Sequence, residues 1–301
     1  MTRTLVLLFL LVSLVLPIFS YADDAASTEK QAASQAATSY EEPKLNLLSW
    51  LTNIPGDWVA ASKTIFSKES ITPFLWVVGS TAVLMNQDYE LYIPLKKAYQ
   101  RDKTFYDASN FGWEVGKGGS EIALGGGFLL SGIIWKNHKA VRTASQIAEV
   151  VLATGVTTQV LKHMTGRESP SVAISPKTGM WRFFLSPKTY SHRVSAHDAY
   201  PSGHLATTIA TANVIMNNYP DQKWIPYVAY PVIGFVAVSM VSTGGHWWSD
   251  YPLSIFLGYH MAKAVTRHNP EMQSKAEMKQ GQFDIAPVKN GLAMTYTKLI
   301  F

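Results

Sequence analysis

The segment from Trp224 to Gly245 constrains the fold more than any other, because its 22 residues carry no formal charge. A helix of this length can cross a lipid bilayer. Pro226 and Pro231 lie in the first third of the segment, so a buried core helix that begins near Pro231 explains the same composition. Membrane span and core helix are both open interpretations of this segment.

Other stretches also predict helices. Thr72-Pro73 has the form of an N-cap followed by a first-turn proline. An apolar stretch runs from Ile122 to Trp135, and its run Gly125–Gly127 should allow close helix packing or a break. A long helix is predicted from Val141 to His163, and it leads the chain through Lys162. The sequence therefore predicts an all-α body, which we place at residues 44–282.

The N-terminal end differs from this body in composition. Arg3 precedes a continuous apolar run from Leu5 to Phe19, and small residues stand at Ser20 and Ala22. This arrangement is typical of a signal peptide, predicted at residues 1–22. Residues 23–43 contain almost no large apolar side chain, so they cannot bury enough surface to offset the entropy of ordering. We interpret them as a disordered linker.

The C-terminal end shows the pattern of a β-hairpin. Asn290-Gly291 is a strong two-residue turn signal, and Leu292, Met294 and Tyr296 alternate with small or polar residues. One hairpin is too little for a membrane barrel, whatever the aromatic residue Phe301 suggests. We expect residues 283–301 to form a short hairpin that packs on the helical body.

Charge and cysteine content limit the function. The formal net charge is +5, and removal of the signal segment with its one arginine would leave +4. This mild excess agrees with an anionic substrate or a membrane surface, and no nucleic-acid partner is expected. The chain has no cysteine, which excludes disulfides, thiol catalysis and lipid attached to cysteine. We expect an exported protein of a bacterial periplasm, with membrane association as an open possibility.

The stretch "GGHWWSD" holds His246 and Asp250 four residues apart, which is one turn on one face of a helix. Such a pair can be a metal ligand with its support, a base held by a carboxylate, or a capped helix start. A second stretch, Pro201-Ser202-Gly203-His204, can open a helix whose free N–H groups face an anion, with His204 beside it as a proton donor.

A third stretch, "LKHMTGRESP", ends a helix with the cations Lys162 and Arg167. The three stretches together supply two histidines, a carboxylate, a helix N-terminus and fixed positive charge. Transfer of a phosphoryl group to an imidazole needs these groups.

The order of these motifs resembles the signature of the type 2 phosphatidic acid phosphatase (PAP2) family, whose superfamily includes the vanadium haloperoxidases. That signature reads Lys-x6-Arg-Pro, Pro-Ser-Gly-His and Ser-Arg-x5-His-x3-Asp. The match begins at Lys162 and Pro170, continues through the tetrapeptide from Pro201, and ends at Ser239, His246 and Asp250. The resemblance implies a helical bundle of the PAP2/haloperoxidase type.

The resemblance also implies a role for each site residue. His246 would attack phosphorus and form a phosphohistidine, Asp250 would hold the other ring nitrogen, and His204 would protonate the leaving alcohol. The phosphoryl oxygens would be held by Lys162, Ser202 and the Gly203 backbone N–H. The resemblance implies no metal and no cofactor, and the expected substrate is a phosphate-bearing lipid or a small phosphate ester.

The chain departs from the signature at two positions, because Ser169 and Met240 stand where the family has arginine. Neither side chain can grip a phosphate in a bidentate manner. Loss of one such donor typically costs about 3 to 4 kcal/mol of transition-state stabilisation. Arg167 is the first candidate to replace the missing charge, and Ser169 is a further candidate phosphate contact.

Three functions are compatible with these motifs. The first is a metal-independent phosphatase that acts on lipid or other phosphate esters or diphosphates. The second is a catalytically impaired PAP2-like protein that binds phosphate-bearing lipid. The third is a vanadate-dependent peroxidase, which ranks last because trapping vanadate needs more fixed positive charge than this site offers. The intact His204, His246 and Asp250 favour catalysis, and the missing arginines favour binding.

Overall fold

The computed structural model describes residues 49–174, 178–269, 282–288 and 291–297. The predicted signal peptide and linker lie outside the described residues. The described chain is predominantly helical, as the sequence predicts. Its contacts divide it into two units, and the helical body consists of Leu45–Met216 and Gln222–Val265.

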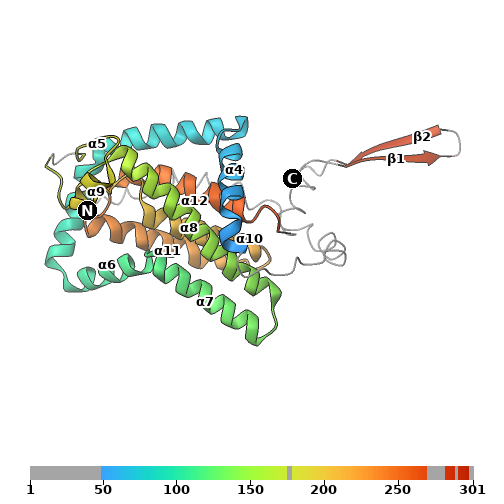
Figure 1. The fold of residues 1–301 in the computed structure, drawn as a ribbon, viewed down its shortest axis with the longest axis horizontal. Coiled ribbons are helices and arrows are strands. Elements are labelled where there is room, and N and C mark those ends of the chain that lie inside the picture. The colour runs from blue at the N-terminus through green and yellow to red at the C-terminus, as the bar shows by residue number, and fades with distance from the viewer. Residues whose placement is uncertain (1–48, 175–177, 270–281, 289–290, 298–301) are drawn as a thin grey trace. The chain divides into compact units, whose positions relative to one another are not determined.

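The helical body contains most of the elements in Figure 1. They are α3 (Ser49–Thr52), α4 (Ile54–Ile65), η2 (Lys68–Ser70), α5 (Ile71–Arg101), α6 (Lys103–Val115), α7 (Gly118–Ile134), α8 (His138–Thr165), α9 (Pro187–His192), η3 (Val194–Ala196), α10 (Gly203–Asn218), α11 (Trp224–Ser242), η4 (Trp248–Asp250) and α12 (Tyr251–Val265).

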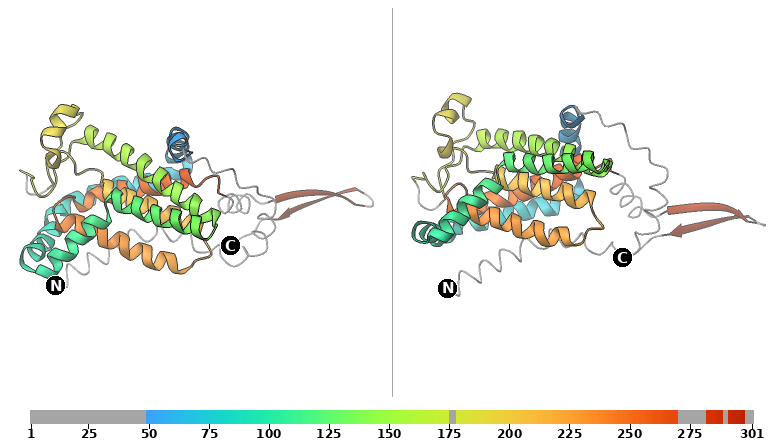
Figure 2. Two further views of the ribbon diagram at one scale, coloured as in Figure 1. Left: turned by 60° about the horizontal axis from the view of Figure 1, so that its bottom comes forward. Right: turned by 90° about the horizontal axis from the view of Figure 1, so that it is seen from below.

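The helices pack around a core that α4, α8, α10 and α12 share. Ile147, Val150 and Val214 are fully buried in this core, together with Ala262. α7 and α8 form a helical hairpin, and α11 packs along α6. Figure 2 shows the connection from α8 to α10, which contains α9, at one end of the body. The residues of the sequence motifs lie on this connection and beside it.

The predicted helices are present, with shifted boundaries. α5 begins at Ile71, so Thr72 lies inside the first turn and the predicted N-cap is wrong, whereas Pro73 is a first-turn proline as predicted. α7 continues through its glycine run without a break. A Cβ on Gly125 would lie 3.2 Å from Ile147 Cγ2, so this glycine lets α7 approach α8 closely.

The apolar segment that constrains the fold forms one continuous helix, α11. The helix begins at Trp224, so a start near Pro231 is wrong. Pro226 falls in the first turn, where a missing N–H has no intrahelical partner to lose. The early residues Tyr227 and Val228 are exposed, whereas the last turns, such as Val236, are buried. Among the described residues, α11 is the one helix long and apolar enough to cross a membrane.

The second unit includes Asn217–Asp221 and Thr266–Phe301. Asn217 donates a hydrogen bond to Thr266 at 3.0 Å, and Asn269 donates one to Asn218 at 2.7 Å. Within the same unit, β1 (Gln282–Val288) pairs antiparallel with β2 (Gly291–Thr297). These strands overlap the range 283–301 in which the sequence predicts a hairpin; the hairpin and its packing on the helical body stay predictions.

Candidate active site

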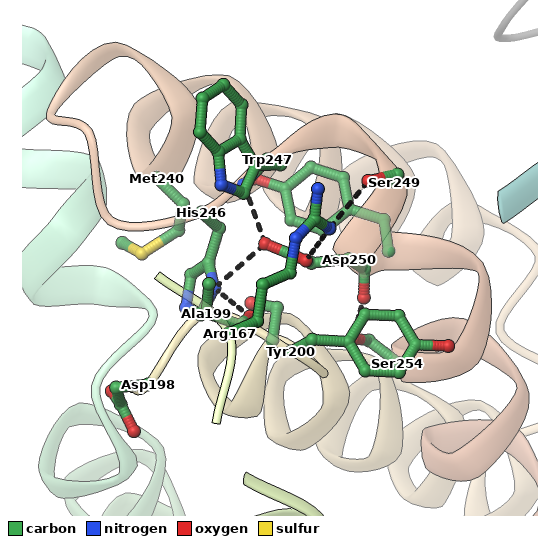
Figure 3. A network of polar contacts seen from close by, with 12 residues as sticks. Arg167, Asp198, Ala199, Tyr200, Met240, His246, Trp247, Ser249, Asp250 and Ser254 are labelled. Atoms are coloured by element: carbon green, nitrogen blue, oxygen red, sulfur yellow. Dashed lines mark hydrogen bonds and ion pairs between the residues drawn. The ribbon is translucent and has the colours of Figure 1, made fainter. Parts of the chain in front are cut away.

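The ring of His246 is oriented through its Nδ1 atom. Nδ1 lies 2.7 Å from the carbonyl oxygen of Ala199 and 3.6 Å from Oδ2 of Asp250, as Figure 3 shows. A carbonyl can only accept a hydrogen bond, so Nδ1 carries the proton. In the neutral ring, Nε2 is then left with its lone pair. The buried His246 is therefore in the tautomer that a nucleophile at Nε2 requires.

The carboxylate of Asp250 is engaged mainly by other groups. Its Oδ2 accepts the backbone N–H of Trp247 at 2.7 Å, and its Oδ1 accepts from Arg167 at 2.5 Å. Its distance of 3.6 Å to His246 fits an ion pair but exceeds a hydrogen bond. The holding role that the resemblance gives to Asp250 is therefore taken largely by the Ala199 carbonyl. A backbone carbonyl has no signature in the sequence, so the motifs could not reveal it.

Arg167 lies at the centre of a buried polar network. Its guanidinium is fully buried, and it donates to Asp88 at 2.7 Å, to Ser249 at 2.7 Å and to Asp250. Its Nε donates to the carbonyl of Thr178 at 3.0 Å. The guanidinium donors are thus already bonded to groups inside the protein. The geometry thus argues against the predicted role of Arg167 as a phosphate ligand, because two buried carboxylates already hold its charge.

Asp88 joins α5 to this network, and the sequence motifs do not contain it. Its Oδ1 accepts the backbone N–H of Ser249 at 3.0 Å, and its Oδ2 accepts the Ser249 hydroxyl at 2.5 Å. Burial raises the pKa of the Asp88 carboxyl to about 6, although the Arg167 guanidinium opposes this rise. The network fixes η4, and with it Asp250, against α5.

The N-terminus of α10 lies beside Lys162. Ser202 is buried, and its Oγ accepts the backbone N–H of Leu205 at 3.3 Å, so it caps the helix. A Cβ on Gly203 would lie 3.6 Å from Nζ of Lys162, which places the ammonium next to the first turn of α10. Helix N–H groups and an ammonium together favour an anion at this position.

Lys162 already has an anionic partner inside the protein. Its Nζ lies 2.9 Å from Oδ1 of Asp198, a residue that the sequence motifs did not single out. The hydroxyl of Tyr190 donates to the same carboxylate. Burial would raise the pKa of Asp198, but Lys162 and Tyr190 hold this pKa below its ordinary value. The cation expected to hold phosphate is therefore neutralised by a carboxylate.

The ring of His204 lies near the rings of His246 and Trp113. Its ring centroid lies 5.9 Å from that of His246 and 5.1 Å from that of Trp113. Burial lowers the pKa of His204 to about 3, and electrostatic interactions with His246 and Lys162 also lower it. The ligand-free ring is therefore uncharged at neutral pH. A bound anion would oppose this shift, so proton donation by His204 requires a phosphoryl group in the site.

The two positions that depart from the signature are both buried. Met240 is fully buried, and its carbonyl accepts the N–H groups of Gly245 at 2.9 Å and His246 at 3.2 Å. Figure 3 shows the Met240 side chain next to His246. Ser169 is also buried, and its N–H donates to the Ser195 carbonyl at 3.1 Å. Neither side chain brings charge to the site.

Comparison with known proteins agrees with the resemblance in the sequence. The family model of the PAP2 superfamily matches residues 143–272, which include the three motifs. This match is consistent with a PAP2-like phosphatase, because members of that superfamily are generally phosphatases that act on phosphate esters. No curated protein and no solved structure matches the chain.

Proposed function

We propose that this chain is a phosphatase that cleaves lipid or other phosphate esters or diphosphates through a phosphohistidine on His246. One observation carries the proposal: the bond from Nδ1 of His246 to the Ala199 carbonyl leaves the lone pair on Nε2. The attacking atom is thus prepared in a protein whose PAP2 domain suggests phosphatase chemistry. Lys162 and the first turn of α10 supply the groups that would receive the phosphoryl oxygens.

The reaction proceeds in two steps. Nε2 of His246 attacks phosphorus, the bond from phosphorus to the leaving oxygen breaks, and His204 gives its proton to that oxygen. Water then attacks the phosphohistidine, the P–N bond breaks, and His204 takes the proton from water. Lys162, the Ser202 hydroxyl and the Gly203 N–H hold the phosphoryl oxygens through both steps. No metal takes part in this mechanism.

A second candidate is an impaired PAP2-like protein that binds phosphate-bearing lipid. Two observations favour it: Asp198 neutralises Lys162, and the pKa of His204 is lowered to about 3 in the ligand-free site. Purified mature protein incubated with a panel of lipid and soluble phosphates, with a chelator present, separates the two candidates. Release of phosphate or of the leaving alcohol favours the phosphatase, whereas saturable binding without either product favours the second candidate.

Restoration of the missing arginines tests whether their charge limits the reaction. We expect Ser169→Arg with Met240→Arg to raise kcat/KM for p-nitrophenyl phosphate by at least about tenfold, because each guanidinium adds a donor for the transition state. A control protein with Phe66→Arg and Gln100→Arg adds the same charge at exposed positions and should show no gain. Equal rates in both proteins would mean that the missing arginines do not limit hydrolysis.

We also propose that the protein lies outside the cytoplasm and at a membrane. Apolar side chains are exposed on α7 and α11, among them Ile133, Trp135 at the end of α7, and Tyr227. We expect the protein in the membrane fraction, released by detergent and not by salt, with an N-terminus near Asp23 by mass spectrometry. An intact Met1 on the exported protein, or release by salt alone, would contradict this prediction.

A further inference from the structure

The candidate site contains more negative than positive formal charge. Lys162 is paired with Asp198, and Arg167 is paired with both Asp88 and Asp250. Two cations thus face three carboxylates. Lys117, which acts on His204 electrostatically, is itself paired with Glu114 at 2.6 Å. The site is therefore poorly suited to a ligand with two negative charges.

Asp198 is more accessible to an incoming anion than its partner Lys162 is. Its side chain is 26% exposed, whereas that of Lys162 is 6% exposed, so the carboxylate is the more accessible partner of the pair. The Tyr190 hydroxyl donates a hydrogen bond to the same carboxylate oxygen that Lys162 contacts. Asp198 also acts electrostatically on His204 and His246, which places its charge near both histidines.

The charge of a phosphoryl group decides how strongly Asp198 repels it. A phosphomonoester near neutral pH carries close to two negative charges, whereas a phosphodiester carries one. Like charges a few ångströms apart near a protein surface repel strongly. The uncharged side chains of Ser169 and Met240 do not compensate for this repulsion.

We propose that Asp198 is a specificity-determining residue that makes the site select a singly charged phosphodiester over a dianionic phosphomonoester. This inference rests on the proposed function for the reaction, but the charge selectivity of binding does not depend on turnover. The ligand that we propose is a phosphodiester, and it can belong to a lipid headgroup or to a soluble ester.

The same two chemical steps apply to a diester as to a monoester. Nε2 of His246 forms a bond to phosphorus, one P–O ester bond breaks, and the departing oxygen takes a proton from His204. The phosphohistidine keeps the second ester group; water then attacks phosphorus and gives a proton to His204, the P–N bond breaks, and the second ester group stays on phosphorus. The product is a phosphomonoester that gains a second negative charge, so Asp198 also favours its release.

Binding measured at pH 8 by calorimetry tests the role of Asp198, with inorganic phosphate and dimethyl phosphate as probes. We expect wild-type protein to bind dimethyl phosphate more tightly than phosphate. Asp198→Asn should tighten phosphate binding by at least about tenfold and change dimethyl phosphate binding by less than about threefold. Asp107→Asn removes the same charge from an exposed surface pair and should leave both affinities unchanged.

Tighter binding of phosphate than of dimethyl phosphate by wild-type protein would overturn the inference, as would an unchanged selectivity in Asp198→Asn. If Asp198→Asn does not fold, the wild-type preference and the charge-retaining Asp198→Glu, expected to keep that preference, decide the question. A short-chain phosphatidylcholine that binds more tightly than dimethyl phosphate identifies a lipid headgroup as the source, and equal binding identifies a soluble diester; both agree with the inference.

Measurements of turnover with a diester and a monoester test this inference separately from the proposed function. We expect wild-type kcat/KM to be higher for bis(p-nitrophenyl) phosphate than for p-nitrophenyl phosphate, and Asp198→Asn to shift the ratio toward the monoester by at least about tenfold. If no variant hydrolyses either compound, the proposed phosphatase function fails, and the binding selectivity still decides whether Asp198 sets the preference for charge.

Discussion

Replacement of His246 by alanine is expected to abolish hydrolysis of the phosphate ester, with a loss of at least about 10⁴-fold in kcat. The variant lacks the only atom that the mechanism uses to attack phosphorus, and no phosphohistidine can form at this position. Hydrolysis assays measure the first effect. Acid-labile labelling of the protein with radioactive phosphate from substrate measures the second.

Three comparisons make this result specific. His192→Ala removes an exposed histidine and should keep both activity and labelling. Asp250→Asn should reduce turnover less than His246→Ala, because the Ala199 carbonyl still holds Nδ1. A chelator should have little effect on the wild-type protein. Full activity in His246→Ala, or activity that disappears with the chelator, would exclude the proposed mechanism.

The largest effect on stability is expected from Arg167→Met. The substitution leaves the buried carboxylates of Asp88 and Asp250 without their cation. Loss of one partner from a buried ion pair typically costs about 3 to 5 kcal/mol. Since a domain is typically stable by about 5 to 15 kcal/mol, we expect a large fall in the midpoint of unfolding. Denaturant unfolding followed by circular dichroism measures it.

A second substitution separates this structural role from phosphate binding. Arg167→Met with Asp88→Asn removes one unpaired carboxylate and should recover part of the lost stability. Lys103→Met breaks an exposed pair with Asp107 and should change stability little. If Arg167→Met instead folds as stably as wild type and mainly raises KM, Arg167 is the phosphate ligand that the sequence suggested.

The helices were predictable from the sequence because their signals are local. The stretch from Val141 to His163 predicted α8, which runs from His138 to Thr165. Its actual start is set by Asn137, whose side chain caps the helix by accepting the N–H of Ala140 at 3.1 Å. Its end is set by Gly166, which has the left-handed φ of 53°. Apolar patterning indicates that a helix exists, but caps decide its boundaries.

The candidate site was predictable only in part. Motif spacing indicated His204, His246 and Asp250, and the structure brings these residues together. The pairs between Arg167 and Asp88 and between Lys162 and Asp198 join residues far apart in the chain. No local pattern marks such pairs, because their partners come together only when helices pack. Arg167 therefore looked like an available cation in the sequence and is a buried structural cation in the structure.

The bond between His246 and the carbonyl of Ala199 has a consequence for how such a site is studied. Alanine scanning alters side chains and leaves every main-chain oxygen in place, so it cannot measure what this bond contributes. A scan would assign all orientation of the imidazole to Asp250 and find no effect at residue 199, which is alanine already. An amide-to-ester replacement between residues 199 and 200 weakens the carbonyl as an acceptor, and it makes this contribution to catalysis measurable.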